Sequence, residues 1–291
     1  MVKEQDQIKD KVEKVFDHSS TNYDTFIGDT MKQLTNQLLR EITIPKNPIA
    51  LDIACGTGIS TIELIKKSKC LGTFYGIDLS QPMLNKAEQN TVNLGTNNIH
   101  FMKMDAQNLE FPDGMFDIVI CNMSLQFFPD QEKALGEMYR VLKPGGSVGI
   151  LCEGKMAGQE VKDVVLSVAN RHPELPEFVR SVVEFHEGFL DLEETVGLFE
   201  LVGFRGSLIY GRHRFTFVRP EGSFNDTQAY WGVYRSGLPL GVVDFIRDEL
   251  MLEMRSLSGD RGFKRTSYLI IGVGKKPDAR ALVIDDKYKI I

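Results

Sequence analysis

The chain has 291 residues, and its 34 Lys and Arg against 40 Asp and Glu give a formal net charge of −6. This acidic balance argues against a surface that neutralises phosphates, so nucleic acid is not an expected substrate. No apolar run approaches the roughly 20 residues of a membrane span, and residues 1–6 lack the apolar core of a signal peptide. The four cysteines have no metal-ligand spacing, so we expect a reduced, cytoplasmic protein without a metal site.

Two amphipathic helices are predicted ahead of the first strand. Apolar residues recur at helical spacing around residues 8–16 and again around residues 26–38. Between them, Phe16–Asp24 is a polar break with several helix-capping residues. A bare nucleotide-binding fold does not need these helices, so we predict a separate helical cap over residues 1–45.

The next stretch has the pattern of a ligand-binding turn. Ile49–Cys55 is an apolar run that predicts a short buried strand, Gly56-Thr57-Gly58 breaks it, and a helical pattern starts at Ile59. This strand, glycine turn and helix bring backbone N–H groups to a ligand at a helix N-terminus. Asp78 lies 20 residues past Gly58, at the end of a second apolar run, where a carboxylate can accept both hydroxyls of a ribose.

Further strands and helices alternate after this point. Ser80 is a predicted N-cap for the second helix, and the third strand, 99–104, ends at Asp105-Ala106. The fourth strand, 116–121, is almost continuously apolar and is followed by Asn122–Phe128. Ligands sit beyond the carboxyl ends of such strands, so residues 122–126 are expected to face the reacting groups.

Asp52 narrows the choice of ligand. It lies inside the first strand, four residues before Gly56, where it would repel the pyrophosphate of a dinucleotide but attract an ammonium or a sulfonium. At these positions the chain resembles the class I S-adenosylmethionine (SAM) methyltransferases, whose first motif is acid-x-small-x-Gly-x-Gly; Asp52, Ala54, Gly56 and Gly58 match it. The Phe16…Tyr23-Asp24 segment is similar to that of the ubiquinone/menaquinone C-methyltransferases and the malonyl-carrier-protein O-methyltransferases, in which it folds over the cofactor.

The resemblance implies a set of site residues. The cofactor is expected to contact the following positions: Tyr23, Asp52, Ala54, Gly56, Thr57, Gly58, Asp78, Leu79, Met83, Asp105, Ala106 and Asn122. Asp78 would hold the ribose, Leu79 and Met83 would contact adenine, and Asp105 would meet the adenine amino group. The acceptor is expected to meet Gln126, His186 and Trp231, and His186 and Tyr23 are the candidate catalytic residues.

A general base is needed only for a hydroxyl or an activated carbon, and the sequence does not single one out. The candidates are His18, Tyr23, Glu153, His186 and His213, with His186 slightly favoured because it follows the region that borders the pocket in the family. A carboxylate or thiolate acceptor would need no base.

The second half of the chain resembles the family more loosely. Residues 140–146, Arg-Val-Leu-Lys-Pro-Gly-Gly, match it well but form a helix end, so we expect a structural role. Helices are predicted over 161–170, 192–202 and 243–254, and strands over 147–152, 207–217 and 266–273, the last antiparallel. Residues 219–264 are expected to form an inserted lid.

Together these patterns predict an α/β fold with a doubly wound, seven-stranded, mostly parallel sheet of the Rossmann-like methyltransferase type. The SAM-binding core would comprise 46–218 and 265–276, followed by a tail over 277–291. The predicted function is SAM-dependent O- or C-methylation of a small or lipid-like molecule. The alternatives are a malonyl-carrier-protein carboxyl methyltransferase and a non-catalytic SAM-binding module. A nicotinamide dehydrogenase is disfavoured by Asp52 and by the missing third glycine.

Overall fold

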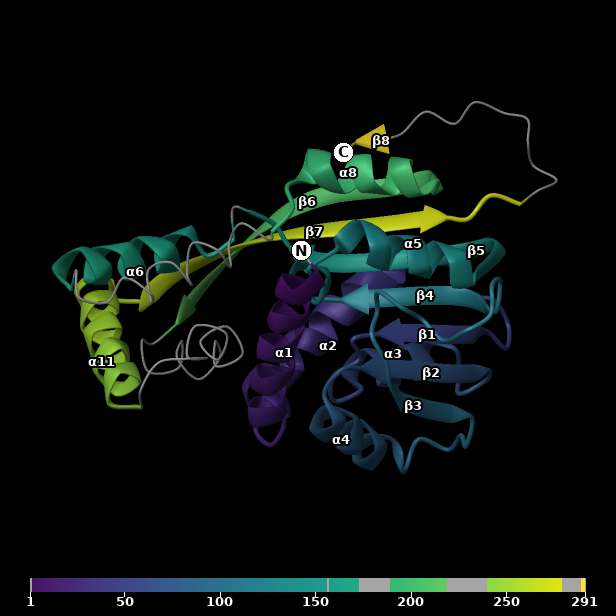
Figure 1. Cartoon of the computed structure of the whole chain (residues 1–291), viewed down its shortest axis with the longest axis horizontal. Coiled ribbons are helices and arrows are strands. Elements are labelled where there is room, and N and C mark those ends of the chain that lie inside the picture. The colour runs from purple at the N-terminus through teal and green to yellow at the C-terminus, as the bar shows by residue number, and fades with distance from the viewer. Residues whose placement is uncertain (1, 156, 173–188, 219–239, 279–288, 291) are drawn as a thin grey trace. The chain divides into compact units, whose positions relative to one another are not determined.

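The computed structural model describes residues 2–155, 157–172, 189–218, 240–278 and 289–290 (Figure 1). The chain divides into two compact units, each described here by itself. Unit 1 comprises Met1–Cys152, Leu190–Gly211 and Ile270–Ile291, and unit 2 comprises Glu153–Phe189 and Arg212–Leu269. None of the helices in the described ranges is long and apolar enough to cross a membrane.

Helices and strands alternate through the first half of the chain, as the apolar periodicity predicts. In chain order they are α1 (Val2–Ser19), α2 (Tyr23–Glu41), β1 (Ile49–Ile53), α3 (Ile59–Lys67), β2 (Thr73–Asp78), α4 (Gln81–Thr91), β3 (Ile99–Lys103), β4 (Phe116–Asn122), the 3₁₀ turn η1 (Leu125–Phe127), α5 (Gln131–Val141) and β5 (Leu142–Glu153). The later elements are α6 (Gln159–Arg171), α8 (Leu192–Val202), β6 (Arg205–Val218), α11 (Leu240–Ser256), β7 (Phe263–Lys275) and β8 (Lys289–Ile290).

One sheet joins all the strands in the order β3-β2-β1-β4-β5-β7-β6-β8. The five strands from β3 to β5 are all parallel. The chain adds β2 and β3 on one side of β1 and then β4 and β5 on the other, so the strand order reverses at β1. β7 runs antiparallel to β5, because Gly145 and Gly146 at the start of β5 bond to Lys276 while Gly154 bonds to Tyr268. This is the predicted doubly wound, mixed sheet, with the two-residue strand β8 added at its edge.

The middle of the sheet forms the core of unit 1. Strand residues of β1, β4 and β5 are almost completely buried, including Leu51, Ile53, Val119, Ile120 and Ile150. Strands this apolar on both faces suit a sheet covered by helices on each side. Because the strands are parallel and closely packed, the loops at their carboxyl ends are held at one edge of the sheet.

Two predicted boundaries are wrong in detail. The break expected over Phe16–Asp24 is only three residues, 20–22, because the hydroxyls of Ser19 and Ser20 donate to the carbonyls of Phe16 and Asp17 and close the last turn of α1. The glycine-rich end of α5 is already part of β5, which starts at Leu142 rather than at residue 147. Pairing with Lys276 extends the strand through Gly145 and Gly146.

Unit 2 contains the helix pair α6 and α11. Its apolar contact is formed by buried residues from both helices, Val164, Val165, Val168, Ile246, Leu250 and Met254. At the edge of the pair, Arg171 lies 2.9 Å from Glu253 and 3.6 Å from Glu249. The predicted lid over 219–264 remains a prediction, since residues 219–239 lie outside the described ranges.

Candidate functional site

The turn after β1 has the backbone of a ligand cradle. Ala54, Gly56 and Gly58 all have positive φ, at 53°, 54° and 82°. A Cβ added at Gly56 would have no heavy atom within 4 Å, whereas one at Gly58 would lie 3.1 Å from the Cβ of Ala87. Gly56 therefore borders open space that a ligand can approach closely, and Gly58 is needed for packing on α4.

Asp78 holds this turn at the end of β2. Its two carboxylate oxygens accept the backbone N–H of Gly56 at 2.8 Å and that of Ser80 at 2.9 Å. Burial raises the pKa of Asp78, and the carboxylate of Asp17 adds to this against the opposing hydrogen bonds. The predicted N-cap of α4 is confirmed, because the Ser80 hydroxyl accepts from the N–H of Met83 at 3.3 Å.

Asp52 is buried in β1 and has one oxygen without a partner. Its Oδ2 accepts from the hydroxyl of Thr61 at 2.6 Å, while its Oδ1 has no hydrogen-bond partner. Burial, together with the charge of Asp78, raises the pKa of Asp52 to about 7 despite the hydrogen bonds from Thr61. A buried carboxylate without a partner is costly, so this position favours a cationic or hydrogen-bond-donating ligand.

A small polar network fixes the side chain of Asn122 at the end of β4. Its Nδ2 donates to Thr35 Oγ1 at 2.9 Å and to Ser60 Oγ at 3.0 Å. The Thr35 hydroxyl donates its hydrogen to the carbonyl of Met31, so in the contact between Thr35 and Ser60 the donor is Ser60. Because both hydroxyl hydrogens are then used, the two hydroxyl oxygens can only accept from the Asn122 amide. These hydrogen bonds fix the orientation of the Asn122 amide and leave its buried Oδ1 as an acceptor without a partner.

Gln126 in η1 also has an amide whose nitrogen is bonded while its oxygen has no partner. Its Nε2 donates to the carbonyl of Met123 at 3.0 Å, and its Oε1 is buried without a partner. Met123 has a positive φ of 58°, which is uncommon outside glycine and marks a sharp turn directly after β4. Asp52, Asn122 and Gln126 thus place three buried acceptor oxygens at or near the carboxyl ends of the adjacent strands β1 and β4.

The two N-terminal helices reach the glycine turn through acidic side chains. Asp17 accepts from the hydroxyl of Ser80 at 2.6 Å, and Asp24 accepts from Thr57 at 2.5 Å and from Asn90 at 2.8 Å. The sequence included Asp17 and Asp24 in the segment that resembles the family but did not assign them a role. These contacts place α1 and α2 against the ends of β1 and β2.

Tyr23 lies in the same region, at the start of α2. Burial and the carboxylates of Asp78 and Asp24 raise the pKa of its hydroxyl, so Tyr23 stays protonated at neutral pH. Its ring is 6.3 Å from that of Phe16, which in turn meets Phe127 of η1 edge-on at 5.5 Å. The segment therefore brings a protonated phenol and an aromatic cluster to the end of β4.

The remaining predicted cofactor positions follow β2 and β3. Leu79 is partly exposed, Met83 is completely buried and Ala106 is buried. Asp105 accepts the backbone N–H of Gln107 through Oδ1 at 2.9 Å and the ammonium of Lys9 through Oδ2 at 2.7 Å. Lys9 was not predicted as a site residue, although its contact places α1 beside this carboxylate.

The structure describes the surroundings of three other candidate bases, His18 in unit 1 and Glu153 and His213 in unit 2. His18 is exposed, and in unit 2 Glu153 lies 3.6 Å from Arg265 while His213 packs against the ring of Tyr268 at 4.8 Å. His186 and Trp231 lie outside the described residues. Tyr23 is thus the predicted catalytic residue whose surroundings the structure defines.

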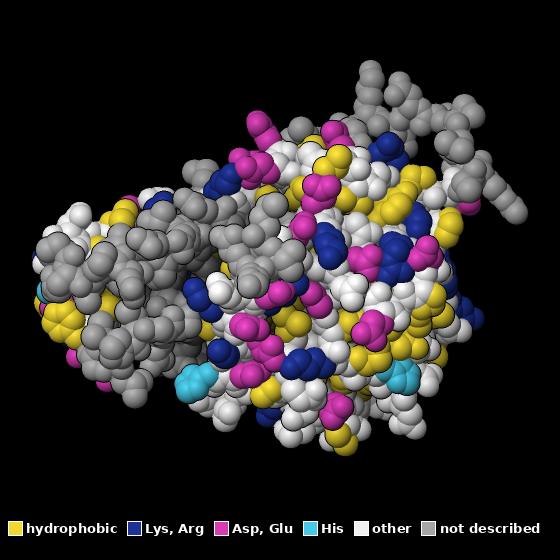
Figure 2. Space-filling view, viewed as in Figure 1, with side chains coloured by type: hydrophobic (Ala, Val, Ile, Leu, Met, Phe, Trp, Pro, Cys, Tyr) yellow, Lys and Arg dark blue, Asp and Glu magenta, His cyan; other side chains and the backbone are white. Residues whose placement is uncertain are grey.

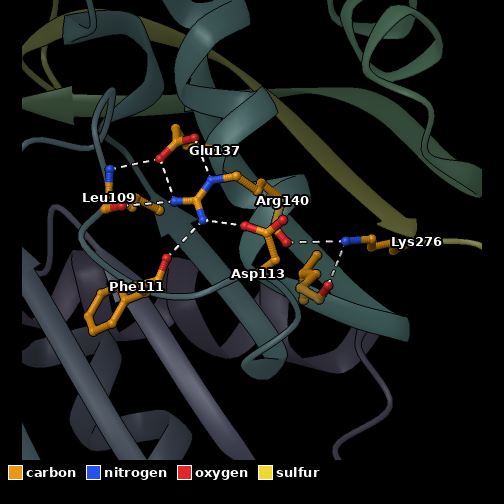
Figure 3. A network of polar contacts seen from close by, with 7 residues as sticks. Leu109, Phe111, Asp113, Glu137, Arg140 and Lys276 are labelled. Atoms are coloured by element: carbon orange, nitrogen blue, oxygen red, sulfur yellow. Dashed lines mark hydrogen bonds and ion pairs between the residues drawn. The ribbon is translucent and has the colours of Figure 1, made fainter.

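Arg140 lies at the centre of a network of polar contacts (Figure 3). Its guanidinium bonds both oxygens of Glu137 at 2.8 Å, the carboxylate of Asp113 at 2.7 Å, and the carbonyls of Leu109 and Phe111 at 2.8 Å. The network ties the loop before β4 to α5, and none of its members is a predicted site residue. Among the described residues on the face shown in Figure 2, acidic and basic side chains are interspersed.

The sequence profile described as the ubiE/COQ5 methyltransferase family matches residues 2–172. The demethylmenaquinone methyltransferase of Staphylococcus carnosus is 39% identical over 142 residues, covering 47% of this chain and 58% of the relative. That of Geobacillus stearothermophilus is 34% identical over 142 residues, covering 47% and 61%. The chain spans about three-fifths of the length of these curated relatives.

Solved structures share the fold at low sequence identity. The YcgJ protein of Bacillus subtilis has a TM-score of 0.59 at 19% identity, covering 85% of this chain and 99% of its own. Phosphoethanolamine N-methyltransferase 2 of Haemonchus contortus, solved with S-adenosylhomocysteine (SAH), has a TM-score of 0.59 at 17% identity, covering 93% and 60%. The predicted Rossmann-like methyltransferase fold is confirmed. With a profile match over more than half of its residues, the chain belongs to the ubiE/COQ5 methyltransferase family.

Proposed function

We propose that this chain is a SAM-dependent methyltransferase that methylates a ring carbon of a quinone-like small molecule in the cytoplasm. Family membership and the names of the relatives support the reaction class and the acceptor. The observation that carries the proposal is the pair of buried, unpartnered acceptors, Asp52 Oδ1 and Asn122 Oδ1, at or near the carboxyl ends of the adjacent strands β1 and β4. SAM has an ammonium with three donors, which fits these oxygens.

The other predicted contacts can be assigned to parts of the nucleoside. The carboxylate of Asp78 has lone pairs left after its two backbone bonds and would accept the ribose hydroxyls. Leu79 and Met83 would cover the faces of adenine, and Asp105 would accept from its amino group. Thr57, Ala54 and Ala106 would approach through the backbone at the ends of β1 and β3.

The acceptor would lie beyond the end of β4. The unpartnered Oε1 of Gln126 can accept a hydrogen bond from a ring hydroxyl of a reduced quinone, which fixes the orientation of that ring. Phe16 and Phe127 supply an apolar, aromatic wall beside it. His186 and Trp231 remain proposed acceptor contacts and His186 the proposed base, although both lie outside the described residues.

SAM supplies a methyl group that a sulfonium already activates, so the chain has mainly to align the nucleophile and exclude water. Such positioning contributes about 7–11 kcal/mol to lowering a barrier. Because its pKa is raised, Tyr23 keeps its proton at neutral pH, so its hydroxyl can donate a hydrogen bond but cannot act as a phenolate base. We therefore propose that Tyr23 orients a bound group rather than removing a proton.

Titration calorimetry with SAH and with 5′-methylthioadenosine, which lacks the amino-acid part, tests this placement. SAH should bind at least about tenfold more tightly, because only SAH brings an ammonium to Asp52 and Asn122. Equal affinity would refute the role of the two acceptors. If SAH does not bind at all, the proposed function is wrong.

A further inference from the structure

One face of α1 lies along the ends of β2 and β3. Lys9, Glu13 and Asp17 follow one another at intervals of four residues, so they share this face of the helix. Lys9 pairs with Asp105 at 2.7 Å, Glu13 accepts from Lys103 at 2.6 Å, and Asp17 accepts from Ser80 at 2.6 Å. Three contacts fix the register of the helix, so Lys9 is held in place rather than being a freely moving surface lysine.

The contact between Lys9 and Asp105 is partly shielded from water. The side chains are 21% and 28% exposed, so the pair is screened less than a fully exposed one. The other carboxylate oxygen of Asp105 already accepts the N–H of Gln107 at 2.9 Å. When a nucleobase approaches, the Asp105 carboxylate therefore already has an ammonium bound to one oxygen and a backbone amide bound to the other.

We infer that Lys9 determines how strictly the site selects the amino group of adenine. The inference rests on the proposed function, in which Asp105 accepts that amino group. A carboxylate alone accepts from an amine and repels a carbonyl oxygen, which would discriminate strongly between the two. An ammonium beside it can donate to a carbonyl and also occupies an acceptor position that the amine would use. The Lys9–Asp105 pair therefore accommodates both groups, and its lysine weakens the selectivity of the carboxylate.

Calorimetry with SAH and S-inosylhomocysteine tests this inference. In S-inosylhomocysteine a carbonyl replaces the amino group and N1 carries a hydrogen, and the N1 change is the same for every variant compared. The measured quantity is the Kd of S-inosylhomocysteine divided by that of SAH, compared between the wild type and Lys9→Met. In Lys9→Met, S-inosylhomocysteine loses a charge-assisted hydrogen bond to its carbonyl. SAH binding improves, because the ammonium no longer occupies an acceptor position of Asp105 that the amine would use. The ratio should therefore rise about three- to tenfold. A ratio equal to that of the wild type would overturn the inference.

Two variants separate this effect from a loosened helix. Lys9→Arg keeps the positive charge and should keep the ratio near the wild-type value. Glu13→Gln removes the charge pairing with Lys103 on the same face, and its ratio should also stay unchanged. If Glu13→Gln raises the ratio as much as Lys9→Met, the effect comes from α1 as a whole and the inference is wrong.

Asp105→Asn distinguishes failure of the inference from failure of the proposed function. If it leaves the Kd of both ligands unchanged, Asp105 does not meet the base, and both the cofactor placement and the inference are overturned. If it lowers the ratio while Lys9→Met leaves the ratio unchanged, the placement stands and only the role of Lys9 is overturned.

Discussion

The carboxylate of Asp78 accepts the backbone N–H of Gly56 at 2.8 Å, joining two residues that are 22 positions apart. The same carboxylate accepts the N–H of Ser80 and so also holds the start of α4. The glycine turn and the second acid of the motif are therefore one structural unit, in which the group proposed to bind the ribose also shapes the turn.

Replacing Asp78 should weaken binding and stability together. Asp78→Ala should raise the Kd of SAH by about tenfold or more, because it removes the acceptor proposed for the ribose hydroxyls. It should also lower the free energy of unfolding by about 1–3 kcal/mol, since two amides lose their acceptor. Asp78→Asn keeps one acceptor oxygen and should be more stable than Asp78→Ala while still binding SAH weakly. Calorimetry and chemical denaturation check this, and an unchanged Kd in Asp78→Ala would contradict it.

SAH binding should depend on pH through Asp52. Burial raises its pKa from 3.8 to about 7, so between these values the folded chain holds a proton that the unfolded chain has released. Its contribution to stability is therefore present at low pH and lost as the pH rises through about 7. The ammonium of a bound ligand beside Asp52 stabilises the ionised form, so SAH should bind about tenfold more tightly at roughly pH 8 than at roughly pH 6.

Asp52→Asn is the control for this pH dependence. Asp78, Cys55 and Cys121 also interact electrostatically with Asp52 or with one another, and they remain in the variant. The Kd of the variant should therefore change much less between the two pH values. A pH dependence as steep as that of the wild type would assign the proton to another group.

Thr35 should act on the ligand through Asn122. Thr35→Val removes one of the two acceptors that hold the Asn122 amide and leaves only Ser60, so the amide and its free oxygen are less firmly fixed. We expect the Kd of SAH to rise several-fold while that of 5′-methylthioadenosine stays the same, because only SAH carries the ammonium. Thr35→Ser keeps the hydroxyl and should restore SAH binding. A parallel loss for both ligands would indicate a merely structural role.

Arg140 should affect stability without affecting binding. Arg140→Lys cannot bond Glu137 through two nitrogens and also reach Asp113 and the carbonyls of Leu109 and Phe111. The free energy of unfolding should fall by about 1–3 kcal/mol, because Glu137 and the part-buried carbonyls of Leu109 and Phe111 lose their donor, whereas the exposed contact with Asp113 adds little. The Kd of SAH should stay within about twofold. A large rise in Kd at unchanged stability would place Arg140 in the binding site.

The sequence predicts the fold well where the spacing of apolar residues follows that of a single strand or helix. The apolar runs of β1, β2 and β4 and the boundaries of α8 appear directly as buried runs or helical spacing. The start of β5 was missed because its first residues are held by Lys276, which lies more than 130 positions away and has no local signal. For the same reason the short strand β8 could not be read from the composition of the tail.

The cofactor motif was visible in the sequence because its residues lie within a few positions of the glycines. The supporting side chains were not, since Thr35, Asn90 and Lys9 reach the site only after the helices pack. The charged stripe of Lys9, Glu13 and Asp17 was a usable signal, because its spacing of four residues places all three on one helix face. Its partners, however, depend on the register of α1 against the sheet.

The central claim is tested most directly by incubating the chain with methyl-labelled SAM and the reduced form of a demethylated menaquinone, and analysing the product by mass spectrometry and NMR. We predict that one labelled methyl group appears on a ring carbon, with SAH formed in equal amount. Binding of SAM without any methyl transfer to the quinone, or a methyl group found on oxygen, would contradict this account.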